Sequence, residues 1–331
     1  MTLDAWSLLE RAFGWGGVVA YHGVGNDPHS PVMHVSAARL EAQLTHLHDR
    51  HTVVPLSELV RRWRGGRSTT GCAAITFDDA YAGVAAHALP ILRALDLSAT
   101  VFIASNHASK RASYWWDDVE RERLALKGGK WCGAPAMVGI PVCEADESSM
   151  ELVRRRVLAL FDGRWPGGIS ASADPLWRSL DVSELAALGR DDRIEFGVHT
   201  LSHPALPMLP FTEQVSEMRD NLAWLRERLP RVLPVVAYPY GLYDRTTVRA
   251  AMEAGMIAGL TMEGRATSNR PNPMIVPRIG AGDLHSPPRL ALKLNRALRP
   301  ALVIRNGGLH PRLPQDVGGR RHAGNRKAPI V

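Results

Sequence analysis

The sequence has few cysteines, and their scarcity excludes several kinds of site. Its 331 residues include three, Cys72, Cys132 and Cys143. This is an odd number, and no pair has the close spacing of a cysteine zinc site or a redox motif. We therefore expect reduced thiols.

Long apolar runs and the features of a signal peptide are also lacking. No stretch approaches the roughly 18 apolar residues that a membrane-spanning helix needs. The N-terminal segment contains Asp4, Glu10 and Arg11, and it lacks the basic start, unbroken apolar run and small-residue cleavage site of a signal peptide. We expect a cytoplasmic protein, in which 45% apolar residues supply the core of one large domain or two small ones.

Acidic residues are scarce only at the C-terminal end. Residues 286–331 contain ten Lys or Arg and one acidic residue, a net charge of +9, whereas the 285 residues before them contain 30 basic and 32 acidic residues. The positive charge therefore belongs to the tail. The body lacks the basic, aromatic-rich surface of a nucleic-acid-binding protein, so no nucleic-acid partner is expected.

Segments typical of strands and of helices alternate along most of the chain. Strands are predicted at 18–22, 52–54, 73–76, 99–103, 194–199, 234–237 and 276–279, and helices at 35–50, 57–63, 83–94, 182–189 and 211–229. Such alternation is typical of parallel β-α-β units, which predicts a barrel or an open doubly wound sheet. The alternation stops between residues 105 and 180, and an insertion of this length usually lies on the functional face of a domain.

Two adjacent carboxylates, Asp78 and Asp79, follow one of these predicted strands. In an α/β barrel the chemistry lies at strand ends, and two bare carboxylates there would raise each other's pKa. A bound cation removes that conflict, which favours one carboxylate as a metal ligand and the other as a proton acceptor. The alternative is a surface turn in which Asp79 caps the next helix.

Two histidines follow a later strand, in the run His-Thr-Leu-Ser-His-Pro at residues 199–204. Imidazoles four residues apart can reach one point when a strand passes into a helical turn. Together with Asp79, His199 and His203 would form a two-histidine, one-carboxylate site, suited first to Zn²⁺ and then to Co, Ni, Mn or Fe ions. Asp78 would remain as the base.

A third strand end leads into the turn Tyr-Pro-Tyr-Gly at residues 238–241. The glycine allows a sharp bend that exposes a backbone N–H, and such a group could stabilise an oxyanion. The alternative is an ordinary strand-to-helix loop before a helix capped by Asp244.

These three runs, in this order, resemble the first three motifs of the polysaccharide deacetylases, carbohydrate esterase family 4 with its NodB-homology domain. The resemblance covers residues 18–279. It implies a distorted (β/α) barrel of about seven strands within residues 1–285, with residues 105–180 as an insertion or lid. It also implies metal-dependent removal of an acyl group, usually acetyl, from an amino sugar.

The resemblance implies a role for each matching residue. Asp78 would be the catalytic base, Asp79, His199 and His203 the metal ligands, and the Tyr240 N–H the oxyanion donor. An amide is a poor electrophile, so the cation would lower the pKa of the attacking water and Asp78 would accept its proton.

Two positions depart from the family pattern. Many members begin the third motif with an arginine where this chain has Ala237, and Arg278, at a late strand end, is the candidate replacement for orienting Asp78. The family also commonly uses a late histidine in an apolar, leucine-containing context to protonate the leaving amine. Here His285 is the nearest match, and His22 at the end of the first strand is a second candidate.

Aromatic residues beside carboxylates suggest a sugar ligand. Trp115 and Trp116 would stack on sugar rings and Asp117 would orient them, with Tyr238 and His22 completing the expected substrate contacts. Burial of the two tryptophans in the core of a lid is the alternative.

The basic C-terminal tail is predicted separately from the barrel. Residues 288–305 could form a basic amphipathic helix, either packed on the barrel or in peripheral contact with an anionic membrane surface, and disorder is expected beyond residue 307.

The sequence thus predicts a metal-dependent hydrolase that removes acetyl from an N-acetylated amino sugar. The substrate would be a saccharide or a precursor of a cell-surface polysaccharide, because a cytoplasmic enzyme meets precursors before finished polymer. Two alternatives stand beside it. One is the same fold acting on a non-sugar amide, such as a formamide or a cyclic ureide. The other is a catalytically inactive carbohydrate-binding relative.

Overall fold

The computed structural model describes residues 17–26, 33–110, 114–117, 158–159, 163, 174–264, 267 and 271–294. Of the predicted insertion, this leaves residues 105–110, the short pieces from 114 to 163, and 174–180 within the described part. Residues 295–331, which hold most of the predicted basic tail, lie outside it.

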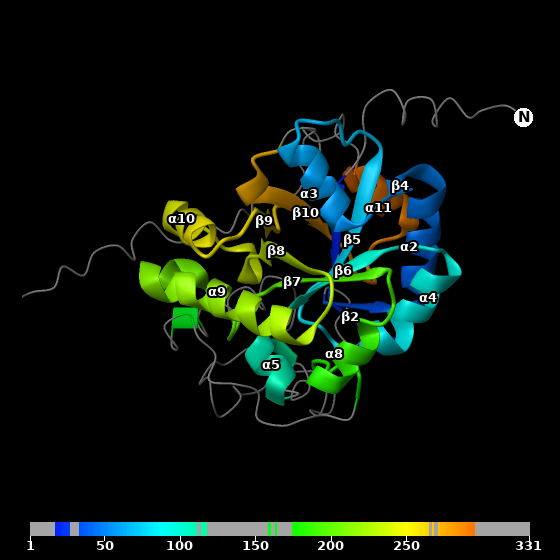
Figure 1. Ribbon diagram of the computed structural model, residues 1–331. Coiled ribbons are helices and arrows are strands. Elements are labelled where there is room, and N and C mark those ends of the chain that lie inside the picture. Colours follow the sequence, from blue (N-terminus) through cyan, green and yellow to red (C-terminus); the bar gives the residue numbers. More distant parts are fainter. Residues whose placement is uncertain are drawn as a thin grey trace, which may run out of the picture.

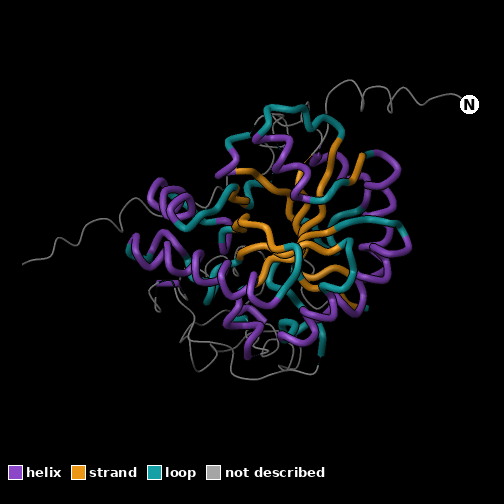
Figure 2. The backbone as a smooth tube through the Cα atoms, viewed as in Figure 1, coloured by secondary structure: helices purple, strands orange, loops and turns teal. Residues whose placement is uncertain are grey.

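Seven parallel strands close into a barrel at the centre of the molecule (Figures 1 and 2). Around the ring they are β1 (Gly17–Tyr21), β10 (Val276–Gly280), β9 (Ala258–Thr261), β8 (Val232–Ala237), β7 (Ile194–Val198), β6 (Ala99–Ile103) and β5 (Cys72–Phe77), and β5 pairs with β1. β4 (Thr52–Val53) adds to the start of β5, while β2 (Gly23–Gly25) and β3 (His34–Ser36) form a separate small sheet. The predicted distorted barrel of about seven strands is confirmed.

Helices surround the strands on the outside, as the tube drawing shows (Figure 2). They are α2 (Ala37–Arg50), α3 (Leu56–Arg64), the π-helical turn η1 (Val84–Ala88) continued by α4 (Leu89–Ala94), α5 (Ser105–Lys110), α8 (Val182–Leu188), α9 (Phe211–Arg228), α10 (Arg245–Glu253) and α11 (Pro287–Leu294). Short 3₁₀ turns lie at η2 (Leu206–Met208), η3 (Pro239–Gly241) and η4 (Pro273–Ile275). No helix within the described ranges is long and apolar enough to cross a membrane.

Two apolar clusters follow from the alternation of side chains along each strand. Outward residues such as Val19 and Ile75 pack with the surrounding helices. Inward residues such as Val18 and Ala74 form a second cluster with Leu59, Val60 and Trp63 of α3. Helix α3 therefore covers the amino end of the barrel.

The start of the predicted tail joins the outer cluster, because Leu290 and Leu294 of α11 are buried in it.

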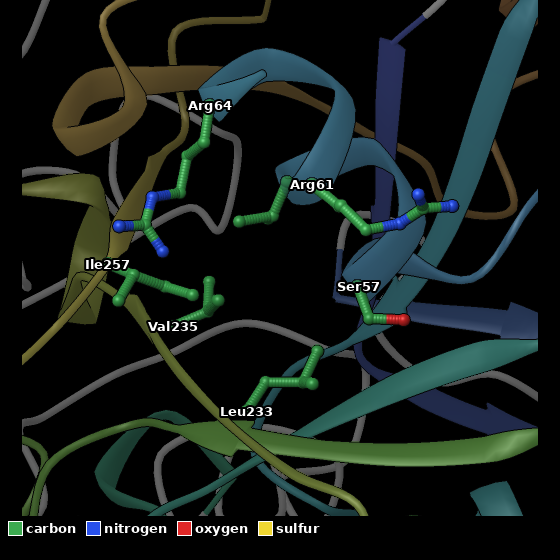
Figure 3. A pocket seen from close by; sticks show the side chains of 7 residues that line it. Ser57, Arg61, Arg64, Leu233, Val235 and Ile257 are labelled. Carbon is green, nitrogen blue, oxygen red and sulfur yellow. The ribbon is translucent and has the colours of Figure 1, made fainter.

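An open groove of about 200 Å³ lies beside α3 at this amino end (Figure 3). Its lining is Ser57, Val60, Arg61, Arg64, Leu233, Val235 and Ile257. The Arg64 side chain extends across it toward Ile257, whereas that of Arg61 points away. None of the predicted site residues lines this groove, and the candidate site lies at the opposite end of the barrel.

Candidate active site

The predicted site residues gather at the carboxyl end of the barrel. Asp78 and Asp79 follow β5, His199 follows β7, and Tyr240 lies in the turn after β8. Because the strands are parallel, their carboxyl ends meet at one end of the barrel, so residues far apart in the sequence come together there.

Asp79, His199 and His203 form a group that could hold a metal ion. One ligand atom from each lies within 4.8 Å of the others, and all three residues are buried. Asp79 Oδ1 is 3.4 Å from His199 Nε2 and 3.6 Å from His203 Nε2. Two imidazoles and a carboxylate are a donor set that suits Zn²⁺ and similar divalent cations.

The two rings are oriented differently by their surroundings. His199 Nδ1 is 2.7 Å from the Ala237 carbonyl oxygen, which can only accept, so Nδ1 carries a hydrogen and Nε2 is the ring atom that faces Asp79. Burial holds the pKa of His203 well below its usual range, so its ring is neutral. Burial also lowers the pKa of His199, but the Asp79 carboxylate outweighs it and leaves that pKa raised.

Asp79 Oδ1 gives the clearest sign that the group fits a metal. This oxygen is buried and accepts no hydrogen bond from the described residues. A buried carboxylate oxygen without a donor is costly, and a bound cation would compensate it. The three residues therefore fit the divalent metal that the donor set suggests.

The loop that carries the two histidines is held by residues that the sequence did not single out. Glu217 of α9 accepts hydrogen bonds from the backbone N–H groups of Leu201 and Ser202, both at 2.9 Å, and from the Ser202 hydroxyl at 2.7 Å. The His203 N–H donates to Thr200 Oγ1 at 3.0 Å. These bonds fix a turn that brings the His203 ring back toward His199.

Asp78 lies beside the metal group but is bound to an arginine. Arg278, fully buried in β10, donates to both carboxylate oxygens of Asp78 at 2.7 and 2.6 Å and to Thr76 Oγ1 at 3.2 Å. Burial raises the pKa of Asp78, but the Arg278 guanidinium outweighs it and the pKa lies below its usual value. Asp78 is thus an ionised carboxylate, and Arg278 occupies the orienting position that the sequence proposed for it.

The two candidate histidines for the leaving amine lie in different places. His22 Nε2 is 4.0 Å from Asp78 Oδ2, with 15% of its side chain exposed, and burial lowers its pKa. His285 instead faces the Gly282 N–H and Lys293 Nζ, the latter at 2.6 Å from its Nε2. Burial and Lys293 lower the pKa of His285 to about 4. The structure therefore places His22, and not His285, beside Asp78.

The tryptophan pair is a packed wall of the site. Trp115 and Trp116 are 3% and 8% exposed. The Trp115 Nε1–H donates to the Tyr240 hydroxyl at 3.1 Å, and the Trp116 ring lies 5.2 Å from the His203 ring in an edge contact. Burial, the alternative to open stacking on sugar, describes both side chains.

The other two predicted sugar contacts, Asp117 and Tyr238, form hydrogen bonds within the protein. Asp117 is buried and accepts from the Tyr81 hydroxyl at 2.9 and 2.8 Å. Tyr238 is fully buried, and its hydroxyl donates to the Met274 carbonyl at 3.0 Å. The polar atoms of both side chains are thus engaged inside the protein, and sugar binding by either stays a prediction.

Comparisons with known proteins agree with this arrangement. A family model described as polysaccharide deacetylase matches residues 65–128 and 164–259, which include both the paired aspartates and the two histidines. The putative polysaccharide deacetylase YxkH of Bacillus subtilis (strain 168) is 22% identical over 255 residues. That alignment covers 76% of this chain and 66% of the relative, just under two thirds of its length.

Solved structures of other proteins share the fold. The Streptococcus pyogenes deacetylase PplD, in complex with acetate, superposes with a TM-score of 0.55 at 17% identity, covering 85% of this chain and 98% of that one. IcaB from Ammonifex degensii gives a TM-score of 0.56 at 19% identity, covering 85% and 97%. By its matched motifs and its seven-stranded barrel, the chain belongs to the polysaccharide deacetylase family.

Proposed function

We propose that this protein is a metal-dependent hydrolase that removes the acetyl group from an N-acetylated amino sugar in a saccharide or polysaccharide precursor. The observation that supports it best is the convergence of Asp79, His199 and His203 within 4.8 Å, with the ionised Asp78 beside them. A cytoplasmic location, where precursors are met before finished polymer, remains part of the proposal.

Asp79 and the two histidines would hold the cation, with Zn²⁺ first and Co, Ni, Mn or Fe ions as alternatives. When bound, the cation supplies a Lewis acid that polarises the amide carbonyl and makes water more acidic. Asp78 accepts the proton of the attacking water. Arg278 keeps Asp78 ionised and fixes both of its oxygens, so the base is ready at neutral pH.

Tyr240 supplies the other group that the reaction needs. Its backbone lies in the left-handed region with φ 59°, inside the η3 turn, and its hydroxyl is held by Trp115. A fixed N–H at this strand end can stabilise negative charge on the carbonyl oxygen during attack. His22, beside Asp78, is the favoured group for returning a proton to the leaving amine.

Two measurements on the purified protein test this function. Metal content is determined after expression without added metal, and acetate release is followed on N-acetylhexosamine oligomers, a formamide and a cyclic ureide. We expect about one divalent ion per chain, release from the amino sugar, and loss of the metal in His199→Ala. Hydrolysis of only the non-sugar amides would assign the fold to that chemistry instead.

The inactive alternative has its own outcome. Binding of amino-sugar oligomers by the metal-loaded protein, with no acetate released above the level of Asp78→Asn, would make the chain a carbohydrate-binding relative. Full metal retention in His199→Ala would contradict the ligand assignment.

A further inference from the structure

We propose that Tyr114 and Ser179 are positioning residues that set the affinity of the metal site by clamping the backbone of its ligand Asp79. The inference rests on the proposed function only in requiring that a cation occupies the Asp79, His199 and His203 group. It concerns side chains outside the three matching motifs.

Both side chains donate to the same backbone oxygen. The Tyr114 hydroxyl and the Ser179 hydroxyl each donate to the Asp79 carbonyl at 3.2 Å. Tyr114 lies 35 residues after Asp79 and Ser179 lies 100 residues after it. Two segments from distant parts of the chain thus converge on the main chain of a metal ligand.

The backbone at Asp79 needs such support. Asp79 and Ala80 have φ values of 68° and 49°, a left-handed conformation that is unfavourable for residues with a Cβ. Because this conformation turns the Asp79 side chain out of the strand direction, relaxing the backbone would move Oδ1 away from the two imidazoles.

The segment that carries Ser179 is itself fastened along this loop. The Leu180 N–H donates to the Ala80 carbonyl at 2.8 Å, and the Ala82 N–H donates to the Arg178 carbonyl at 3.0 Å. Ser179 forms an antiparallel bridge with Tyr81. Ser179 is therefore held at a fixed distance from the Asp79 carbonyl.

Tyr114 is fixed from both faces of its ring. It stacks between His107, at 4.1 Å and 8°, and Trp116, at 4.6 Å and 9°. Its backbone N–H donates to Asp117, whose carboxylate is bound in turn to the Tyr81 hydroxyl. These contacts fix the direction of the Tyr114 hydroxyl, and Asp117 is one of the residues that hold the ring in place.

The same ring stack also contacts a second metal ligand. The His203 ring lies 5.3 Å from Tyr114 and 5.2 Å from Trp116, in edge contacts. The stack therefore holds Asp79 through its backbone and His203 through its ring. Ligands that are fixed in place lose less conformational freedom on binding, so affinity rises.

The test measures metal affinity directly. Zn²⁺ is titrated calorimetrically into chelator-treated protein, and the visible spectrum of the Co²⁺-loaded protein reports the ligand geometry. Tyr114→Phe keeps the stacked ring and removes only the hydroxyl, and Ser179→Ala removes the other donor. Since one such hydrogen bond contributes about 0.5–1.5 kcal/mol, we expect each change to weaken Zn²⁺ binding roughly 3- to 10-fold and the double variant to weaken it further.

Matched controls separate clamping from general loss of a hydroxyl. Tyr243→Phe removes a hydroxyl that donates to Glu263, and Ser109→Ala removes one that donates to the Ser105 carbonyl. Both should bind Zn²⁺ within twofold of wild type. Folding of every variant is checked by thermal unfolding of the metal-free protein, and if Tyr114→Phe does not fold, Ser179→Ala carries the test.

Zn²⁺ affinity within twofold of wild type in the folded variants, with an unchanged Co²⁺ spectrum, would overturn the clamp and leave the proposed function intact. Failure of the wild-type protein to bind any divalent ion would overturn the clamp together with the proposed metal site.

Discussion

The two ends of the barrel each contain a buried carboxylate, but its partners differ. At the carboxyl end, Asp78 is bound by the Arg278 guanidinium through both oxygens. At the amino end, Glu195 accepts from the Ser57 N–H and the Thr100 hydroxyl, both at 3.2 Å, and from the Ser57 hydroxyl. Ser57 lies in the first turn of α3, where the helix dipole favours a negative charge.

The two ends of the barrel also differ in how many residues have a strained, left-handed backbone. Seven described residues other than glycine have a positive φ, and five of them lie in loops that follow β5, β7 and β8: Asp79, Ala80, Thr200, His203 and Tyr240. The other two, Asp96 and Arg231, precede strands at the amino end. Strain and a full buried ion pair therefore coincide where the candidate chemistry lies, while the amino end provides packing.

The largest effect should come from neutralising the carboxylate at the carboxyl end. Asp78→Asn keeps the shape of the side chain and removes the base, so we expect kcat for acetate release to fall by about 10²- to 10⁴-fold with bound metal unchanged. Glu195→Gln should leave kcat within about twofold, since Glu195 supports a helix start and not the reaction. A comparable loss of kcat in both variants would remove the contrast between the two ends.

The next effect concerns pH. Arg278 lowers the pKa of Asp78 against the effect of burial, so in Arg278→Gln burial dominates and that pKa rises. The base is then protonated at pH values where it is ionised in the wild type, and we expect the acid limb of the pH–rate profile to shift upward by about one unit or more.

The same variant should also change how the stability of the protein depends on pH. A carboxyl with a lowered folded-state pKa stabilises the protein above its unfolded pKa and loses that contribution as the pH falls, so Arg278→Gln should show a weaker loss of stability in acid. Leaving Asp78 buried and unpaired costs about 3–5 kcal/mol, and Arg278→Lys, which keeps a charge, should fold better and shift the limb less. An unmoved limb in both variants would contradict the assignment of Asp78 as the base.

A third, smaller effect tests the amino end. In Glu195→Gln an amide N–H₂ replaces one of the two accepting oxygens, so one of the donors from Ser57 or Thr100 loses its partner. We expect the free energy of unfolding to fall by about 1–3 kcal/mol, measured by denaturant titration. Ser57→Ala should lower the free energy of unfolding less, because the Ser57 N–H still donates to Glu195. A larger decrease in Ser57→Ala than in Glu195→Gln would contradict this account.

Residues that follow a strand directly could be predicted from the sequence. Asp78, Asp79 and His199 stand beside short apolar runs, and parallel strands bring such positions together whatever their separation along the chain. Arg278 could be proposed for the same reason, since it lies in a late strand. β9 was missed because its four residues, Ala-Gly-Leu-Thr, carry little strand signal.

Contacts made through space could not be predicted in this way. The hydroxyls of Tyr114 and Ser179 reach the Asp79 carbonyl from segments whose mutual placement no local pattern encodes. The left-handed backbone of Asp79 is equally hidden, because glycine, the usual marker of that conformation, is absent there. The partners of single polar atoms are hidden as well, since the Tyr238 hydroxyl donates to the Met274 carbonyl and His285 Nε2 faces Lys293 Nζ.

The smallest effects should come from placing a glycine at a left-handed position at each end of the barrel. Asp96 has φ 52° just after α4, the position where helices favour glycine, and its N–H donates to the Arg93 carbonyl at 3.2 Å. Asp96→Gly removes the left-handed strain and an exposed ion pair with Arg193, so we expect unfolding free energy to rise by no more than about 1 kcal/mol. Zn²⁺ affinity and kcat should not change.

Ala80→Gly makes the same backbone change beside the metal ligand. It relieves comparable strain at φ 49°, yet the freed backbone lets Asp79 leave the geometry that faces His199 and His203. We therefore expect Zn²⁺ binding to weaken about 2- to 5-fold in Ala80→Gly and to stay constant in Asp96→Gly, measured by calorimetry. Equal Zn²⁺ affinities in the two variants would mean that the left-handed backbone at the carboxyl end has no part in holding the ligand.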